Sequence, residues 1–456
     1  MLQNLFHSWK SLLCELSRPL ANEPKFQDIM AVAATNSLRA NANNSLPEAI
    51  FEKLALSRAK LAFTLLQRLL EVKSTEVAVY DILSVAWDTA RMYNPNVGAA
   101  LGGADADYYR MLLKILYLAL QVHTSPSPNL SKSHSDVANS PRTPESATQI
   151  ALEIVSTVVA QGFRTLTILL HENSAPVRPS DFALLTAILR SALHVPNVAR
   201  NTTHLLNAFS DFQTARCAST LLSWSDQLAT SGDPIYGELS ILFLLEISSV
   251  PSLAELLATE GVLSHILSTN LIRILRSRPF GPFDQPPRMY SIWTRAILPL
   301  LLNLLHSVGP PLAAEVAAAL NNFPHQLDRA SGVFATTSSK DANADYITLS
   351  IASEAVTLSL IVAILHTFRE AGSSAAIVGS AIEEVKWDKV QVKEDVEAAL
   401  QNRRSLRERI TPTKEREEAW SRAKPTVEGS EGENKLEEKI VEEMRSVLGI
   451  LEGNGE

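Results

Sequence analysis

The sequence predicts an all-α fold, a solenoid built from irregular HEAT-like and armadillo-like helical repeats. Its long apolar segments are rich in Leu and Ala, which favour helix over strand. The 456 residues include only 17 glycines and are 46% hydrophobic, so turns are few and the chain can bury a large core. Three consecutive helical stretches also share one pattern of polar residues, which is the strongest indication of stacked helices.

That pattern is a single polar line along an otherwise apolar helix. It runs through Leu46–Lys73, Thr75–Asn94 and Asp105–Val122, where a polar residue recurs every three or four positions. The apolar arc then covers well over half of the helix circumference, which is wider than the stripe of an ordinary surface helix. Neighbouring helices must therefore cover each of these helices on two or three sides. In the first stretch the line consists of Lys53, Ser57, Lys60, Thr64, Gln67 and Glu71.

The expected helices follow one another at irregular intervals of about 20 to 40 residues, which excludes strict tetratricopeptide or ankyrin arrays. A capping box of Ser45 and Glu48 is predicted to begin the second helix, and Asp105 and Ser180 are predicted to cap two later ones. The predicted helices span residues 2–18, 46–73, 75–94, 105–123, 146–171, 180–195, 200–229, 234–249, 251–275, 289–307, 310–322 and 345–371.

Composition predicts four segments along the chain. Residues 1–123 form a first helical-repeat block, and residues 146–380 form a second block of the same solenoid. Between them, residues 124–145 form a flexible Ser/Pro-rich loop. Its Ser-Pro and Thr-Pro pairs are turn residues or phosphorylation sites, and the sequence leaves both interpretations open. Residues 381–456 form a charged, helical C-terminal extension that is predicted to be partly disordered.

The C-terminal extension contains 14 basic and 19 acidic residues, and it includes four clustered arginines. Alternating charges predict a solvated, salt-bridged helix rather than a nuclear-import or RNA-binding patch. Near the end, Leu436–Leu451 places apolar residues at helical spacing, so this helix either docks on the stack or recruits a partner helix. The four arginines are Arg403, Arg404, Arg407 and Arg409.

Three apolar segments raise the question of targeting or membrane insertion. Met1–Leu20 is amphipathic but carries only two bases, so a first solenoid helix is favoured over a mitochondrial presequence. Tyr346–Phe368 and Ile235–Val250 approach the length of a membrane span but contain glutamates. Both are predicted to be buried solenoid helices, and no transmembrane segment is predicted.

No catalytic constellation is found in the sequence. There is no G-x-S-x-G elbow or phosphate-binding P-loop, and the ten histidines are scattered singly. Cys14 and Cys217 alone make neither a disulfide framework nor a zinc site, and reduced, buried thiols are expected. A net charge of −8 argues against direct nucleic-acid binding. We therefore predict no enzyme, no cofactor and no catalytic or metal-binding residue, and the sequence does not identify which residues bind a partner.

Three segments carry a family resemblance: Leu5–Asn41, Leu46–Leu69 and Ala106–Gln121. The first reads LFHSWKSLLCELSRPLANEPKFQDIMAVAATNSLRAN. Together they resemble the C-terminal tail region of the large inner-ring scaffold nucleoporin of fungi, the one-hundred-eighty-eight-kilodalton nucleoporin family. Family members are several times longer than this chain, and no short motif of the family maps to individual residues here.

The resemblance implies a right-handed, karyopherin-like superhelix in the nuclear pore complex of the nuclear envelope. It implies a scaffold that binds short segments of linker nucleoporins in its grooves and supports nucleocytoplasmic transport. The alternative is a transport-related module that binds Phe-Gly repeats or transport factors.

Overall fold

The computed structural model describes most of the chain as α-helix, without a named strand in the described residues. The chain divides into two compact units, Met1–Ala218 and Ser219–Glu456. The predicted loop up to residue 144, the predicted caps Ser45 and Asp105, and Cys14 lie outside the described residues. The predicted four-segment organisation stays a prediction. The described residues are 7–12, 15–16, 23–42, 48–71, 76–93, 97–102, 106–121, 145–173, 176–229, 232–335, 346–374, 382–425 and 433–453.

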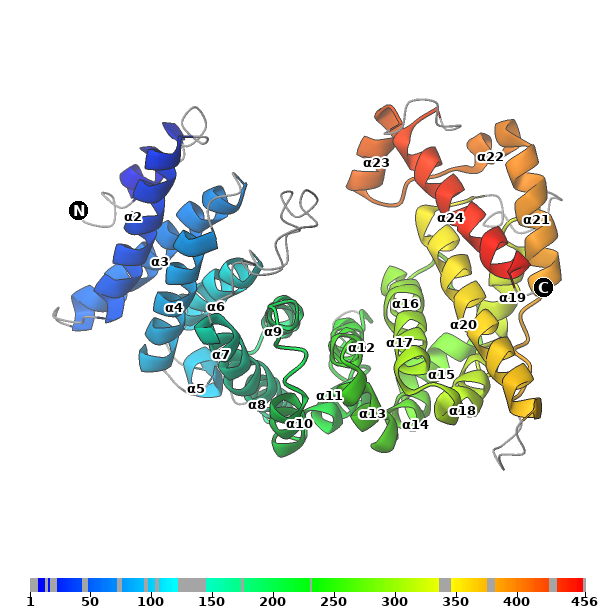
Figure 1. The fold of residues 1–456 in the computed structure, drawn as a ribbon, viewed down its shortest axis with the longest axis horizontal. Helices are drawn as coiled ribbons and strands as arrows, with labels where there is room; N and C mark the ends of the chain where they lie inside the picture. Colours follow the sequence, from blue (N-terminus) through cyan, green and yellow to red (C-terminus); the bar gives the residue numbers. More distant parts are fainter. Residues whose placement is uncertain are drawn as a thin grey trace, which may run out of the picture. The chain divides into compact units, whose positions relative to one another are not determined.

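In the first unit each helix packs against helices a few places further along the chain (Figure 1). Helix α2 contacts α3 and α4, α3 and α4 both contact α6, and α6 contacts α9. This short-range succession of contacts is typical of a solenoid. The elements are α2 (Pro24–Ala42), α3 (Glu48–Glu71), α4 (Glu76–Tyr93), α5 (Val97–Gly102), α6 (Ala106–Gln121), α7 (Glu145–Glu153), the π-helix η2 (Ile154–Ala160), α8 (Gln161–His171), α9 (Pro179–Leu193), α10 (Thr202–Asp211) and the start of α11 (Thr214–Ser223).

The predicted polar line is confirmed along α3. Of the predicted line, Lys60, Gln67 and Glu71 are exposed, Ser57 and Thr64 are half-exposed, and the Lys53 side chain lies outside the described part. The sides of the helix are closed mainly by small and branched apolar residues, which allows neighbouring helices to approach closely. The buried residues of the second half of α3 are Ala59, Leu61, Ala62, Leu65, Leu66 and Leu69.

Arg110 of α6, which belongs to the polar line predicted for Asp105–Val122, does not follow that pattern. The line in this helix was expected to face water, but Arg110 is only 7% exposed. Its Nε and Nη2 atoms donate to the two carboxylate oxygens of Asp181 on α9, at 2.7 and 2.8 Å. Because this paired, bidentate geometry compensates the lost hydration, the guanidinium can be buried between two helices.

The observed start of α9 also differs from the predicted one. Ser180 was predicted as the cap, but Arg178 is the N-cap residue and Pro179 opens the helix. The side chain of Asp181 accepts a hydrogen bond from the Arg178 backbone N–H at 3.0 Å. Asp181 therefore closes the helix start and neutralises Arg110 at the same time.

Three helices were not predicted, and two predicted helices are divided. Helices α2, α5 and α19 (Pro324–Gly332) lie where the sequence has small or mixed residues and the periodic signal is weak. The stretch 200–229 contains α10 and α11, which Gln213 separates with a φ of 48°. The stretch 251–275 is divided at Gly261, whose φ of 66° suits a residue without a Cβ atom.

In the second unit, successive helices again cover one another. Helix α17 contacts α12, α13 and α20, and α20 contacts α24. The elements are α12 (Ile235–Ser248), α13 (Pro251–Thr259), α14 (Val262–Ser268), α15 (Asn270–Ser277), α16 (Pro287–Ser291), the π-helix η3 (Ile292–Ile297), α17 (Leu298–Val308), α18 (Pro310–Asn321), α19, α20 (Leu349–Ser374), α21 (Lys389–Gln401), α22 (Arg403–Arg409), α23 (Glu415–Arg422) and α24 (Lys435–Glu452).

The C-terminal extension packs onto this unit. The amphipathic helix predicted near the end is α24, which lies along α20 (Figure 1). Leu436, Ile440 and Met444 of α24 are completely buried. Of the two predicted possibilities, docking on the stack and recruitment of a partner helix, the structure shows docking. The single salt-bridged helix expected over the charged segment is instead three short helices, α21 to α23.

Three helical stretches are long and apolar enough to cross a membrane by length and composition. They are Ser146–His171, Pro287–Val308 and Leu349–Glu370. In the first two, 50% of the most apolar window is buried inside the structure, and in the third 44% is buried. About half of each window is therefore packed against the rest of the structure.

Glu354 of α20 is the polar centre of the second unit's core. It is 1% exposed and accepts hydrogen bonds from Trp293 Nε1 at 2.7 Å and Tyr290 OH at 2.8 Å. It also forms an ion pair with Arg329 of α19. Burial opposes the charge on Arg329, but the Glu354 carboxylate outweighs burial and raises the pKa of the guanidinium. One carboxylate therefore joins α16, η3, α19 and α20.

Replacing Arg329 with Met should destabilise this unit by about 3–5 kcal/mol, because it leaves a buried carboxylate without a countercharge. In the double variant Arg329→Met/Glu354→Gln, the amide oxygen can still accept from Trp293 Nε1, the amide NH2 group can donate to the Tyr290 hydroxyl, and no buried charge is left. We expect the double variant to be more stable than Arg329→Met alone, as measured by urea unfolding followed by circular dichroism. Additive losses from the two single variants would contradict the coupling.

Candidate functional site: a groove beside α20 and α21

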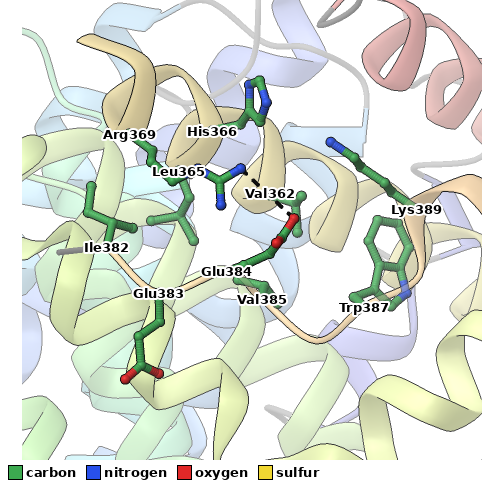
Figure 2. Close-up of a pocket in the computed structure, with 10 residues that line it drawn as sticks. All are labelled: Val362, Leu365, His366, Arg369, Ile382, Glu383, Glu384, Val385, Trp387 and Lys389. Carbon is green, nitrogen blue, oxygen red and sulfur yellow. Dashed lines mark ion pairs between the residues drawn. The ribbon is translucent and has the colours of Figure 1, made fainter. Parts of the chain in front are cut away.

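A groove runs between the second half of α20 and the segment that leads into α21 (Figure 2). One hollow is bounded by α20, by the extended segment 382–388 and by Lys389 at the start of α21. A second hollow shares Val362, His366 and Lys389 with the first, so the two are continuous. We call them together the α20–α21 groove. The second hollow is further lined by Ala363, Val390, Lys393, Glu394, Glu397 and Leu451.

The extended segment 382–388 forms one wall of the groove and is held by α18 and α19. Asn321 at the end of α18 donates to the Glu384 carbonyl at 3.0 Å and accepts from the Lys386 N–H at 2.9 Å. The Asp388 N–H donates to Ser331 Oγ at 3.2 Å. Trp387, only 4% exposed, anchors the segment in the core. These contacts fix the extended segment 382–388 as one wall of the groove.

The opposite end of the groove is formed by α21 and the end of α24. Asp388 caps α21 by accepting from the Gln391 N–H at 3.0 Å. Lys393 lies between two carboxylates, 3.9 Å from that of Glu397 and 3.6 Å from that of Glu452 on α24. This ion-pair bridge holds the two helix ends together beside Leu451.

The groove combines apolar surface with charges of both signs. Val390 is 60% exposed, and Val362, Ala363 and Leu451 are partly exposed. The Arg369 guanidinium lies 3.9 Å from the Glu384 carboxylate, as the dashed line in Figure 2 shows. Exposed apolar side chains next to paired surface charges are typical of a protein–protein contact rather than of a catalytic pocket.

The described residues also provide no evidence for reaction chemistry. Among them, no group of three or more His, Cys, Asp and Glu side chains could hold a metal ion. Burial raises the pKa of the Cys217 thiol, which makes it a poorer nucleophile. A further hollow in the first unit is lined by Trp87, Arg91 and Glu153, where the indole N–H donates to the carboxylate at 2.9 Å.

Sequence reasoning did not find the groove. It identified the composition change near residue 381, which is where the groove's wall begins, but it named no residue of the site. Of the arginine cluster, which was interpreted as salt-bridged, Arg404 pairs with Glu408, and Arg407 pairs with Glu433 and Glu437. Arg409 donates to the carbonyls of Val333 and Phe334, and so ties α22 to the end of α19.

Comparison with known proteins gives the family. Residues 82–451 match the family model described as the nuclear pore protein NUP188 C-terminal domain. The chain belongs to this family. Nucleoporin NUP188 of Chaetomium thermophilum is 34% identical over 498 aligned residues, which cover 99% of this chain and 26% of that protein. Nucleoporin nup184 of Schizosaccharomyces pombe is 24% identical over 67% of this chain and 19% of that protein.

A solved structure supports the same conclusion for the fold. A fragment of Nup188 from Myceliophthora thermophila matches with a TM-score of 0.68 and 35% identity. The match covers 82% of this chain and 98% of the fragment. The predicted all-α solenoid and the resemblance to this nucleoporin family are thereby confirmed. Membership of the NUP188 family makes the chain a scaffold segment of the nuclear pore complex in the nuclear envelope, and it spans about a quarter or less of its curated relatives.

The wall of the groove in this NUP188 domain should depend on Asn321. Replacing Asn321 with Ala removes three hydrogen bonds to the segment 382–388, the longest of them to the Glu383 carboxylate at 3.4 Å, with a net loss of about 1–3 kcal/mol. We expect faster hydrogen–deuterium exchange at the Lys386 amide. The neighbouring variant Asn322→Ala is the control, because the Asn322 side chain bonds only within its own helix, to the Ala318 carbonyl. Equal exchange in both variants would contradict the assignment.

Proposed function

We propose that this NUP188-family segment is an inner-ring scaffold that binds short helical segments of linker nucleoporins and thereby supports nucleocytoplasmic transport. We place the binding site in the α20–α21 groove. The observation that carries the proposal is the exposed Val390, which lines one hollow together with Val362 and Leu451. This hollow continues into the one whose wall, the segment 382–388, is held by Asn321. An amphipathic helix presents apolar side chains at the spacing that such a groove can accept.

The energetics suit a linker segment. About four apolar anchors would contribute roughly 6–12 kcal/mol before costs, at 1.5–3 kcal/mol each. Ordering a flexible segment takes back about 2–5 kcal/mol, and association takes more. The remainder corresponds to micromolar to nanomolar binding, so no chemistry is needed for the function.

Calorimetry with linker-nucleoporin fragments tests the proposal. A fragment that binds this chain should bind the Val390→Asp variant about tenfold or more weakly, because a carboxylate replaces an apolar contact of about 1.4 kcal/mol. Val32→Asp is a matched control, since Val32 on α2 is similarly exposed at 57%. Equal weakening by both variants, or no binding of any fragment at tens of micromolar, would argue against the groove.

A second function is favoured by an aromatic pair elsewhere in the second unit. Phe283 and Tyr346 are 42% and 43% exposed, and their rings meet edge to face with centroids 5.6 Å apart. Exposed aromatic rings can receive the phenylalanine of a Phe-Gly repeat. The alternative function is therefore binding of Phe-Gly repeats or of transport factors, as in karyopherins.

Titration with Phe-Gly peptides separates the two functions. If the alternative holds, a Phe-Gly peptide should give a saturable calorimetric signal that Phe283→Ala/Tyr346→Ala abolishes and Val390→Asp leaves unchanged. A Ser-Gly peptide of equal length is the control ligand. No saturation at about millimolar peptide would remove this alternative.

A further inference from the structure

A cluster of three cations surrounds one indole ring at the junction of α23 and α24. Arg416 lies over the ring of Trp420, with its guanidinium carbon 4.7 Å from the ring centroid. The ammonium groups of Lys439 and Lys435 lie 5.2 and 6.0 Å from the same centroid. We call these four residues the Trp420 cluster. The ring holds three positive charges within a small area of surface.

The three cations lack the partners that other basic residues of the segment have. Arg404, Arg407 and Arg422 each form an ion pair with a glutamate. Within the described part of the chain, no carboxylate lies within ion-pair distance of Arg416, Lys435 or Lys439. This is unexpected in a chain with 49 acidic and 41 basic residues. The cluster is thus a local positive site on an acidic protein.

Helix electrostatics does not explain the cluster. Arg416 lies in the first turn of α23, and Lys435 is the first residue of α24. The positive end of the helix dipole disfavours cations at both positions, where acidic residues are usual.

The cluster is held on a fixed backbone. The buried carboxylate of Glu417 accepts from the Thr413 N–H at 2.7 Å and closes the start of α23. The Lys435 N–H donates to the Ala423 carbonyl at 3.0 Å, which joins α24 to the residue that follows α23. Asn434 caps α24 by accepting from the N–H groups of Leu436 and Glu437. The charges are therefore presented with a small loss of conformational freedom on binding.

We infer that the Trp420 cluster binds an acidic peptide segment of a partner protein, whose carboxylates pair with Arg416, Lys435 and Lys439. A single-stranded nucleic acid fits less well. The ring carries cations where a base would have to stack. The inference does not depend on the proposed groove. The cluster and Leu451 lie near opposite ends of α24, about 20 Å apart along the helix axis.

Fluorescence anisotropy of the whole chain with a labelled peptide of glutamate and alanine tests this site. We expect saturable binding that weakens when salt rises from about 50 to about 200 mM. A glutamine–alanine peptide of equal length should not bind. The variant Arg416→Gln/Lys435→Gln/Lys439→Gln should bind the acidic peptide at least about tenfold more weakly. All three residues lie at the surface, and circular dichroism would verify the fold.

The matched control is Lys25→Gln/Arg39→Gln/Lys60→Gln, which removes three exposed charges from the first unit. It changes the net charge equally and should leave binding of the peptide unchanged. A second variant, Trp420→Leu, keeps all charges but removes the ring, and it should weaken binding several-fold. Equal losses in the two triple variants would overturn the inference. So would absence of peptide binding at about millimolar concentration, or tighter binding of a single-stranded oligonucleotide at the same salt.

Discussion

The fold depends on helices whose apolar surface is too wide for one neighbour to cover. In α3 buried residues lie on several sides of the helix, and among its described side chains Lys60, Gln67 and Glu71 are the exposed ones. Such a helix is stable only between other helices, and each added helix presents the same requirement to the next. This explains why α2, α3, α4, α6 and α9 contact one another in succession.

Burying helices on several sides also buries charged side chains, which is unfavourable unless they are paired. Both units contain a buried guanidinium–carboxylate pair between two helices. Arg110 and Asp181 connect α6 to α9 in the first unit, and Arg329 and Glu354 connect α19 to α20 in the second. In both pairs a guanidinium and a carboxylate from different helices neutralise each other away from water. Buried pairs of this kind contribute little net stability, but removing one partner is costly. We regard them as determinants of which helices pack together.

The second unit carries two proposed binding sites that differ in chemistry. The α20–α21 groove offers apolar side chains between paired charges, which suits an amphipathic helix. The Trp420 cluster offers cations around a ring, without a carboxylate partner in the described part of the chain, which suits carboxylates. Both sites involve α24, whose buried face is fixed on α20, so a scaffold segment of the NUP188 family would present them on one rigid element.

The sequence by itself determined the helical class, the exposed line of α3, the amphipathic helix Leu436–Leu451 and the family resemblance. These follow from residue periodicity or extended similarity, which are local properties of the chain. It missed α2 and α19, where small or mixed residues give weak periodicity. It also placed Arg110 on the surface, because only the tertiary structure brings Asp181 to it from 71 residues away. The groove and the Trp420 cluster were likewise formed by tertiary packing and were not visible in the sequence. Asn321 meets the segment 382–388 only when α18 packs beside it, and Arg416 and Lys439 meet at the Trp420 ring only when α23 packs on α24.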